Sequence, residues 1–206
     1  YCRVFQIGFR AVLPVLPYRE PEIIRSCADL GPVLEKEHAR TVLVVTDRGI
    51  VENGFTAPLE EALRDARVNY AVYDKTQPNP TVDQVEEALE LYHQRQCTAI
   101  IAIGGGSSMD CAKAVGARVA YPNKPLSHMK GVLRVLKATP PIIAIPTTAG
   151  TGSEVTLAAV ITDGHEHHKY AIMSFPLIPH YAMLDARLTY TLPPHLTSTT
   201  GMDALT

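Results

Sequence analysis

Four short and almost entirely apolar runs constrain the fold of this chain more than any other feature. They are TVLVVT at 41–46, NYAVY at 69–73, AIIAI at 99–103 and PIIAI at 141–145. A strand with one face in water alternates between apolar and polar residues, whereas a strand that is buried on both faces does not. Three of the runs lack this alternation, so they predict parallel strands that are covered by helices on both sides.

Segments with helical periodicity separate these runs. Residues 58–67 and 82–95 each place their apolar side chains on one helical face, and residues 29–37 form a shorter predicted helix. Alternation of strands and helices is typical of an α/β protein. We therefore expect a Rossmann-like, doubly wound and mostly parallel sheet with flanking helices.

Beyond residue 155 the alternation becomes looser. Residues 156–161 and 169–173 are predicted as the strands of a hairpin, with a polar turn at 163–165, and residues 181–184 as a further strand. The sequence therefore predicts a β-hairpin added to the α/β layer.

Composition narrows the class of protein. The 206 residues include 19 Lys and Arg against 21 Asp and Glu, a formal net charge of −2 that argues against a nucleic-acid partner. No apolar run approaches the roughly 20 residues that span a bilayer, so we expect no membrane partner. The four cysteines lack a CxxC pair. This pattern argues against a disulfide framework or a cysteine-ligated zinc ion and favours a cytoplasmic location.

The strongest signal for function is a glycine-rich turn between a strand and a helix, GGGSS at 104–108. Glycines lack Cβ atoms, so backbone N–H groups can approach a ligand closely. Ser107 or Ser108 is a suitable N-cap for the following helix, whose amino end carries a partial positive charge. The segment predicts a cradle for a phosphate or pyrophosphate. It matches neither G-x-G-x-x-G nor a Walker A loop, and a tight turn without a ligand is the alternative.

A second loop of small and hydroxyl residues, PTTAGTGSE at 146–154, follows the last of the four runs. Ligands of parallel α/β sheets bind beyond the carboxyl ends of the strands. We therefore expect this loop and the glycine turn to meet at one edge of the sheet. An ordinary turn in which Thr151 or Ser153 caps a helix is the alternative.

Further candidates lie near other strand ends. Asp47 directly follows the first run, where its carboxylate suits ribose hydroxyls and repels a 2′-phosphate, or caps a turn. Thr81 and Gln84 predict a capping box behind the rigid segment that holds Asn79 between two prolines. Lys169 begins a predicted strand from which it can reach a cofactor, with a solvated lysine as the alternative.

The histidine-rich turn HEHH at 165–168 does not predict a metal site. It lacks the helical i, i+4 spacing and the supporting acids of a dedicated centre. The remaining histidines are scattered along the chain, so the residue pattern alone predicts no metal centre.

Five motifs in this order resemble the iron-containing (group III) alcohol dehydrogenase family. They are VVTD at 44–47, PNPT at 78–81, GGGSSMDCAK at 104–113, PTTAGTGSEVT at 146–156 and TGMDALT at 200–206. The resemblance extends from about residue 40 to residue 206. Before residue 40 the pattern departs from the family, because SCADL at 26–30 stands where the family has a Gly-x-Gly.

The resemblance implies an NAD-binding α/β domain at residues 1–195 and the start of a truncated helical metal-binding domain at 196–206. It also implies that the rest of an all-helical C-terminal domain is missing from this chain. The implied function is NAD-dependent interconversion of a small primary alcohol or diol and its aldehyde, by metal-assisted hydride transfer. The family holds a divalent metal, iron or sometimes zinc, with one Asp and three His. Only Asp203 matches a ligand here, so we expect the chain by itself to be inactive.

The resemblance also assigns cofactor binding to residues of the motifs. The glycine turn would hold the NAD pyrophosphate, and Asp47 would face the adenine ribose and favour NAD over NADP. The expected cofactor-binding residues are Asp47, Asn79, Gly104, Gly105, Gly106, Ser107, Ser108, Asp110, Lys113, Thr147, Thr148, Thr151, Thr156 and Lys169.

Other functions stay open at this point. A glycerol dehydrogenase or a dehydroquinate synthase would bind NAD and a divalent metal on a related architecture. A non-catalytic nucleotide-binding module is an alternative of a different class. The expected partners are a small alcohol or aldehyde and further copies of the chain, in a homodimer or a higher oligomer.

Overall fold

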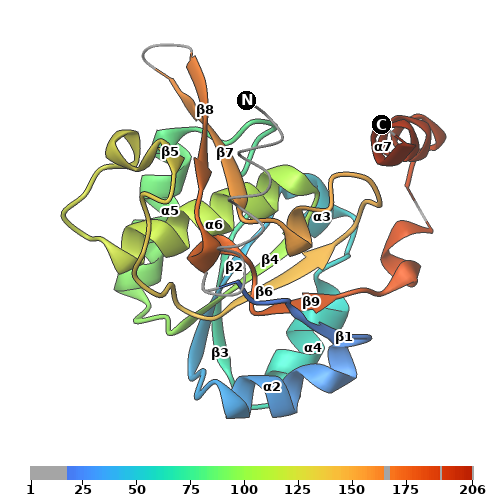
Figure 1. The fold of residues 1–206 in the computed structure, drawn as a ribbon. Coiled ribbons are helices and arrows are strands. Elements are labelled where there is room, and N and C mark those ends of the chain that lie inside the picture. Colours follow the sequence, from blue (N-terminus) through green and yellow to red (C-terminus); the bar gives the residue numbers. More distant parts are fainter. Residues whose placement is uncertain (1–17, 165–167, 191, 206) are drawn as a thin grey trace.

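A six-stranded parallel sheet forms the centre of the molecule (Figure 1). The computed structural model describes residues 18–164, 168–190 and 192–205. The strands of this sheet are β1 (Glu22–Ile24), β2 (Thr41–Val45), β3 (Asn69–Tyr73), β4 (Ala99–Gly104), β6 (Ile142–Pro146) and β9 (Tyr181–Met183). They lie in the order β1-β9-β6-β4-β2-β3, and every neighbouring pair is parallel. All four apolar runs form strands, which confirms the predicted parallel sheet.

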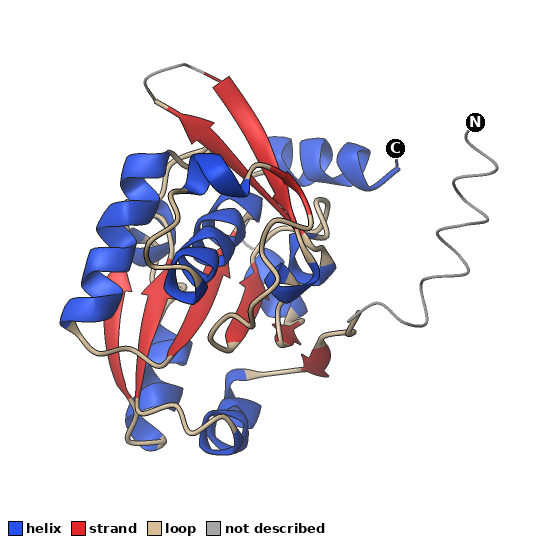
Figure 2. Cartoon of the chain, turned by 60° about the vertical axis from the view of Figure 1, so that its left-hand side comes forward, coloured by secondary structure: helices blue, strands red, loops and turns tan. Residues whose placement is uncertain are grey.

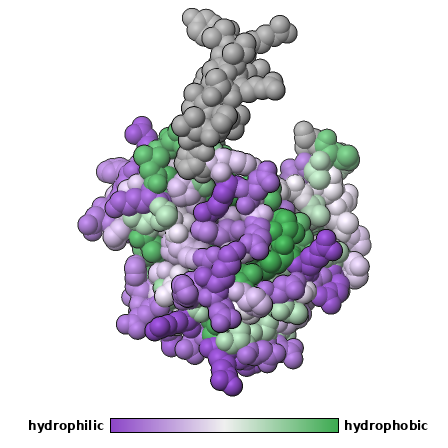
Figure 3. Space-filling model, turned by 60° about the horizontal axis from the view of Figure 1, so that its bottom comes forward, coloured by the Kyte–Doolittle hydropathy of each residue, from purple (hydrophilic) through white to green (hydrophobic). Residues whose placement is uncertain are grey.

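Helices cover both faces of this sheet (Figure 2). The α-helices are α2 (Leu30–Lys36), α3 (Arg48–Glu52), α4 (Ala57–Asp65), α5 (Val82–Gln94), α6 (Gly106–Ala120) and α7 (Pro194–Leu205). Residues of α5 and α6 pack on one face, and residues of α2 and α4 pack on the other. The arrangement confirms the doubly wound α/β fold. The outer side of the layer that contains α2 and α4 is largely hydrophilic (Figure 3).

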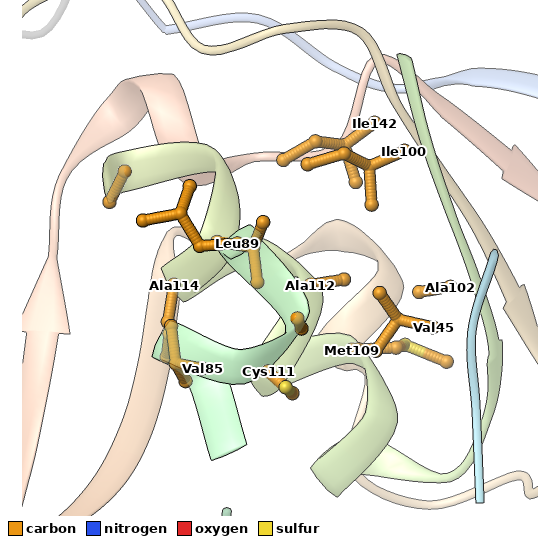
Figure 4. Packing of buried hydrophobic residues seen from close by; sticks show 14 of the residues in the cluster. Val45, Val85, Leu89, Ile100, Ala102, Met109, Cys111, Ala112, Ala114 and Ile142 are labelled. Atoms are coloured by element: carbon orange, nitrogen blue, oxygen red, sulfur yellow. The ribbon is translucent and has the colours of Figure 1, made fainter. Parts of the chain in front are cut away.

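Consecutive residues of the central strands point into two separate cores, which explains why the runs do not alternate. Ile100 and Ala102 of β4 belong to the core under α5 and α6, whereas Ile101 and Ile103 belong to the core under α2 and α4. Every residue of β4 is buried. Figure 4 shows part of the first core, where Ala102 lies among side chains of α6 such as Met109. An exposed strand face would require polar residues at alternate positions.

The order of the strands creates a switch point between β2 and β4. The chain runs from β2 outward to β3 and then returns across β2 to enter β4 on its other side. The connections at the carboxyl ends of β2 and β4 therefore leave in opposite directions. This switch point is the expected binding position in a sheet of this type.

The predicted hairpin forms, but it does not join the main sheet. Strands β7 (Ala158–Asp163) and β8 (His168–Met173) are antiparallel and build a separate small sheet with β5 (Gly131–Val132), in the order β5-β8-β7. The first hairpin strand begins at Ala158, so the predicted start at residue 156 is wrong. Residues Ser153–Val155 form a 3-10 helix, and Thr156 is held by a hydrogen bond from a lysine described below. The turn predicted at 163–165 lies partly outside the described residues.

The amino-terminal region contains structure that the sequence pattern did not predict. Strand β1 pairs with β9, about 160 positions further along the chain. The helix predicted over 29–37 is a 3-10 turn, Cys27–Asp29, followed by α2. The carboxylate of Asp29 accepts a hydrogen bond from the backbone N–H of Ser26 at 3.1 Å, which fixes this start.

Helix α7 lies to the side of the main sheet (Figure 1). It begins at Pro194, next to the domain boundary predicted between residues 195 and 196. That boundary stays a prediction. Every helix in the described part of the chain is too short or too polar to cross a membrane.

The capping box at the start of α5 gives a direct test of local stability. Thr81 Oγ1 accepts a hydrogen bond from Gln84 N at 3.3 Å, and Gln84 Oε1 accepts one from Thr81 N at 3.2 Å, which confirms the predicted motif. We expect Thr81→Ala to lower the free energy of unfolding by about 1 kcal/mol, because it leaves a helix N–H group without its acceptor. Thr81→Ser keeps the hydroxyl and should retain most of that stability in urea denaturation. Equal losses in both variants would contradict the role of the cap.

Candidate functional site

The glycine-rich turn joins β4 to α6 at the switch point. Strand β4 ends at Gly104, and Gly105 is the N-cap residue of α6. The prediction that Ser107 or Ser108 caps the helix is therefore wrong, because both serines already lie in its first turn. Glycine at the cap contributes no side chain, so the N–H groups of the first turn and the positive end of the helix dipole point at the turn.

The first position of the turn, Gly104, requires glycine. Gly104 has a φ angle of +143°, which side chains rarely tolerate. A Cβ atom on Gly104 would lie 2.6 Å from Ser108 Oγ and 3.4 Å from Asp47 Oδ2. A Cβ atom on Gly106 would lie 3.3 Å from Thr151 Oγ1. The two glycines therefore let the side chains of Ser108 and Thr151 pack closely against the backbone of the turn.

The hydroxyl-rich loop lies directly beside the glycine turn, as its sequence predicts. Gly104 and Pro146 are partners in the sheet register, and Thr147 N donates a hydrogen bond to Gly104 O at 2.9 Å. A Cβ atom on Gly105 would lie 3.8 Å from Thr148 Oγ1. The start of the hydroxyl-rich loop is therefore bonded directly to the glycine turn.

Asp47 sits on the opposite side of the switch point, at the end of β2. One carboxylate oxygen, Oδ1, accepts a hydrogen bond from Ile50 N at 3.0 Å and caps α3. The other oxygen, Oδ2, lies near Gly104, as described above. Of the two roles that the sequence left open, the structure confirms the helix cap, and the ribose contact stays a prediction.

Asn79 and Lys169 form a third part of the site, next to Ser107. Lys169 Nζ donates a hydrogen bond to Asn79 Oδ1 at 2.7 Å, and Asn79 N donates one to Ser107 Oγ at 3.3 Å. Asn79 has a φ angle of +60°, a conformation that asparagine tolerates better than most residues. These contacts connect the hairpin to the glycine turn through the PNPT segment.

Asp110, Lys113 and Thr156 belong to one hydrogen-bonded group that Ser153 joins. The Lys113 ammonium donates hydrogen bonds to Ser153 O, at 2.6 Å, and to Thr156 O, at 3.0 Å. Asp110 accepts hydrogen bonds from Ser153 Oγ and Val160 N, each at 3.1 Å. Burial lowers the pKa of Lys113 to about 8 and raises the pKa of Asp110.

Ser153 is the residue of this site that sequence reasoning missed, since it was considered only as a helix cap. In the structure it bridges Lys113 and Asp110. A signal for this arrangement exists in the sequence. Lys113 stands among small apolar residues of a helix, where a charged side chain must find an internal partner.

Asp203, the expected metal ligand, lies on α7. This helix touches the hydroxyl-rich loop, because a Cβ atom on Gly150 would lie 2.5 Å from Thr200 O. Within residues 18–164, 168–190 and 192–205, no three His, Cys, Asp or Glu side chains lie close enough together to hold a metal ion. The described residues do not fit a complete metal centre.

The sequence profile of the family described as iron-containing alcohol dehydrogenase matches residues 24–186 of this chain. The chain belongs to the iron-containing alcohol dehydrogenase family. This confirms the resemblance seen in the five motifs.

Individual relatives within the iron-containing alcohol dehydrogenases support this assignment. The chain is 41% identical over 165 residues to choline dehydrogenase of Bacillus subtilis, a match that covers 79% of this chain and 41% of the relative. It is 39% identical over 177 residues to the NAD-dependent methanol dehydrogenase of Bacillus methanolicus, covering 86% of this chain and 46% of the relative. The chain therefore spans less than half the length of these relatives.

Solved structures of the iron-containing alcohol dehydrogenases show the same fold. A 1,3-propanediol oxidoreductase superposes with a TM-score of 0.87 at 32% identity, covering 93% of this chain and 51% of that structure. Sulfoacetaldehyde reductase from Bifidobacterium kashiwanohense, solved in complex with NAD+, superposes with a TM-score of 0.78 at 33% identity, covering 91% of this chain and 50% of that structure. The Rossmann-like fold is thus confirmed.

Proposed function

We propose that this protein is an NAD-dependent alcohol oxidoreductase that interconverts a small primary alcohol or diol and its aldehyde with the help of a divalent metal. One observation carries the proposal, namely the junction of the glycine turn and the hydroxyl-rich loop at the switch point of a parallel sheet. Relatives named methanol dehydrogenase and 1,3-propanediol dehydrogenase support the substrate class. The solved complex of a relative with NAD+ supports the cofactor.

The residues at the switch point fit a dinucleotide. Gly104, Gly105 and Gly106 lead into the amino end of α6, where N–H groups that no helical carbonyl accepts would bind the pyrophosphate. Asp47 Oδ2, which lies near Gly104, would accept hydrogen bonds from ribose hydroxyls. Thr147, whose backbone N–H binds the turn, begins the hydroxyl-rich loop that would lie beside the dinucleotide. NAD, when bound, would take up the hydride that the alcohol carbon loses.

The metal of the family needs more ligands than the described residues bring together. We propose Asp203 as one ligand of a divalent ion, iron or zinc. Carboxylate oxygen suits such an ion, which would act as a Lewis acid toward the alcohol oxygen. Among the described residues, Asp203 is not joined by two further side chains that could complete a metal site.

The proposal also covers the domains of the protein, its location and its assembly. We propose residues 1–195 as the NAD-binding domain and residues 196–206 as the start of a helical metal-binding domain. A cytoplasmic location agrees with the free thiols of Cys27, Cys97 and Cys111. A homodimer or higher oligomer is the proposed assembly.

Calorimetric titration with NAD, followed by an assay of NADH formation, tests this function. A protein that contains this chain together with a complete metal-binding domain, here called the intact protein, should bind NAD with a dissociation constant in the range of roughly 1 μM to 1 mM. It should also reduce NAD in the presence of methanol or 1,3-propanediol. The 206-residue chain alone should bind NAD without oxidising alcohol. NAD binding without turnover by the intact protein would favour a non-catalytic module, and a preference for glycerol would favour glycerol dehydrogenase. Absence of saturable NAD binding would contradict the proposal.

A further inference from the structure

A completely buried lysine lies behind the glycine turn. Lys113 is on α6, two turns after the glycine turn, and its side chain is 0% exposed. Its ammonium nitrogen lies among five oxygen atoms of residues 153–158, where the hydroxyl-rich loop ends and the chain leads into β7. These are Ser153 O at 2.6 Å, Ser153 Oγ at 3.1 Å, Thr156 O at 3.0 Å, Thr156 Oγ1 at 3.1 Å and Ala158 O at 2.9 Å.

This arrangement resembles the coordination of a cation by backbone oxygens. An ammonium group has three N–H donors and carries a full charge, so hydroxyl and carbonyl oxygens can surround it from several directions. Three of the five acceptors are backbone carbonyls, which fixes the path of the chain from Ser153 to Ala158. Asp110, one helical turn before Lys113, binds the same segment through Ser153 Oγ and Val160 N.

The segment held by Lys113 continues directly from the loop that faces the glycine turn. Thr147 N donates to Gly104 O, and the Thr151 side chain lies 3.3 Å from the position that a Gly106 Cβ would take. The two ends of the hydroxyl-rich loop are thus both held. Its beginning is bonded to the glycine turn before α6, and its end is bonded to Lys113 in the middle of α6. A shift of the 153–158 segment would move the hydroxyls away from the turn.

Stability alone gives a weak reason to bury this charge. Removing an ammonium group from water is costly, and a well-packed apolar side chain often serves a core at least as well. The charged groups that face Lys113 are Asp110 on the same helix and Glu154 on the 3-10 helix, and both favour its protonated form.

We propose that Lys113 is a positioning residue for dinucleotide binding, whose buried ammonium holds residues 147–156 in the shape that places their hydroxyls beside the glycine turn. The inference rests on the proposed function for the identity of the ligand. It assigns Lys113 and Asp110 to the support of the cofactor loop and not to contact with the cofactor.

Chemical rescue of Lys113→Ala tests this role. The alanine variant lacks the three methylene groups and the ammonium beyond Cβ, which propylammonium can replace. We expect Lys113→Ala to weaken NAD binding at least tenfold in calorimetry and to speed amide hydrogen exchange over residues 147–158. Millimolar propylammonium should restore most of both properties, whereas tetramethylammonium, which has no N–H donors, should not. Lys36→Ala, at an exposed lysine, is the matched control and should keep the NAD affinity.

If Lys113→Ala does not fold, Ser153→Ala removes only the hydroxyl that accepts from Lys113 and donates to Asp110. It should still weaken NAD binding and speed exchange over 147–158. Unchanged NAD affinity and unchanged local exchange in both variants would overturn the role of Lys113. If the unmodified protein does not bind NAD, the proposed function fails, and local exchange still shows separately whether Lys113 fixes the loop.

Discussion

Replacing Gly104 with alanine is expected to weaken NAD binding about a hundredfold, which corresponds to about 2.7 kcal/mol. The φ angle of +143° is strained for any residue with a side chain, and the new Cβ would lie only 2.6 Å from Ser108 Oγ. Ser108 is buried in the first turn of α6, so the start of the helix must move to make room. The N–H groups that would hold the pyrophosphate would move with it. Calorimetric titration with NAD measures the loss.

Gly131→Ala is the matched control for this substitution. Gly131 also has a positive φ angle, +98°, but among the described residues no atom lies within 4 Å of the position of its Cβ. Its substitution should lower the free energy of unfolding by roughly 1 to 3 kcal/mol through backbone strain alone and leave the NAD affinity unchanged. Equal NAD affinities for Gly104→Ala and the unmodified protein would contradict a pyrophosphate site at this turn.

Asp47→Ser is expected to shift the cofactor preference toward NADP. The carboxylate of Asp47 would repel a 2′-phosphate, and contact between like charges costs several kcal/mol. Its removal should therefore tighten NADP binding by at least about thirtyfold, or about 2 kcal/mol. NAD binding should weaken several-fold, because a ribose acceptor is lost. Arg48, the exposed next residue, would then be available to a 2′-phosphate.

Comparison with Asp47→Ala separates charge from helix capping. Serine can replace the carboxylate as the acceptor for Ile50 N, whereas alanine cannot. Both variants should gain NADP affinity, and only the alanine variant should lose about 1 kcal/mol of stability in urea denaturation. Unchanged NADP affinity in both would show that Asp47 does not face the adenine ribose.

The layered fold could be predicted from the sequence because burial on both faces leaves a local signature. Ile100 and Ile101 are adjacent and point into different cores, so neither position tolerates a polar residue. The meeting of the two loops was predictable for a similar reason, since parallel strands place their carboxyl ends at one edge. The capping box at Thr81 was visible in four consecutive residues.

Features that depend on distant contacts could not be predicted in this way. Strand β1 exists only through its pairing with β9, which no local pattern indicates. The cap of α6 was misassigned to a serine, because the sequence does not show that the chain leaves the sheet at Gly104, opposite Pro146. Lys113 carried a signal in its apolar surroundings, but its acceptors lie 40 to 45 positions further along the chain.

Hydrogen exchange of the intact protein with and without NAD tests the central claim most directly. If the switch point between β2 and β4 binds the dinucleotide, saturating NAD should slow amide exchange at residues 104–108 and 147–151. Exchange in the segment around Asp47 should slow as well. The amino ends of the strands, on the opposite edge of the sheet, should exchange at unchanged rates. Saturable NAD binding that protects some other part of the chain and leaves the glycine turn unprotected would contradict this account.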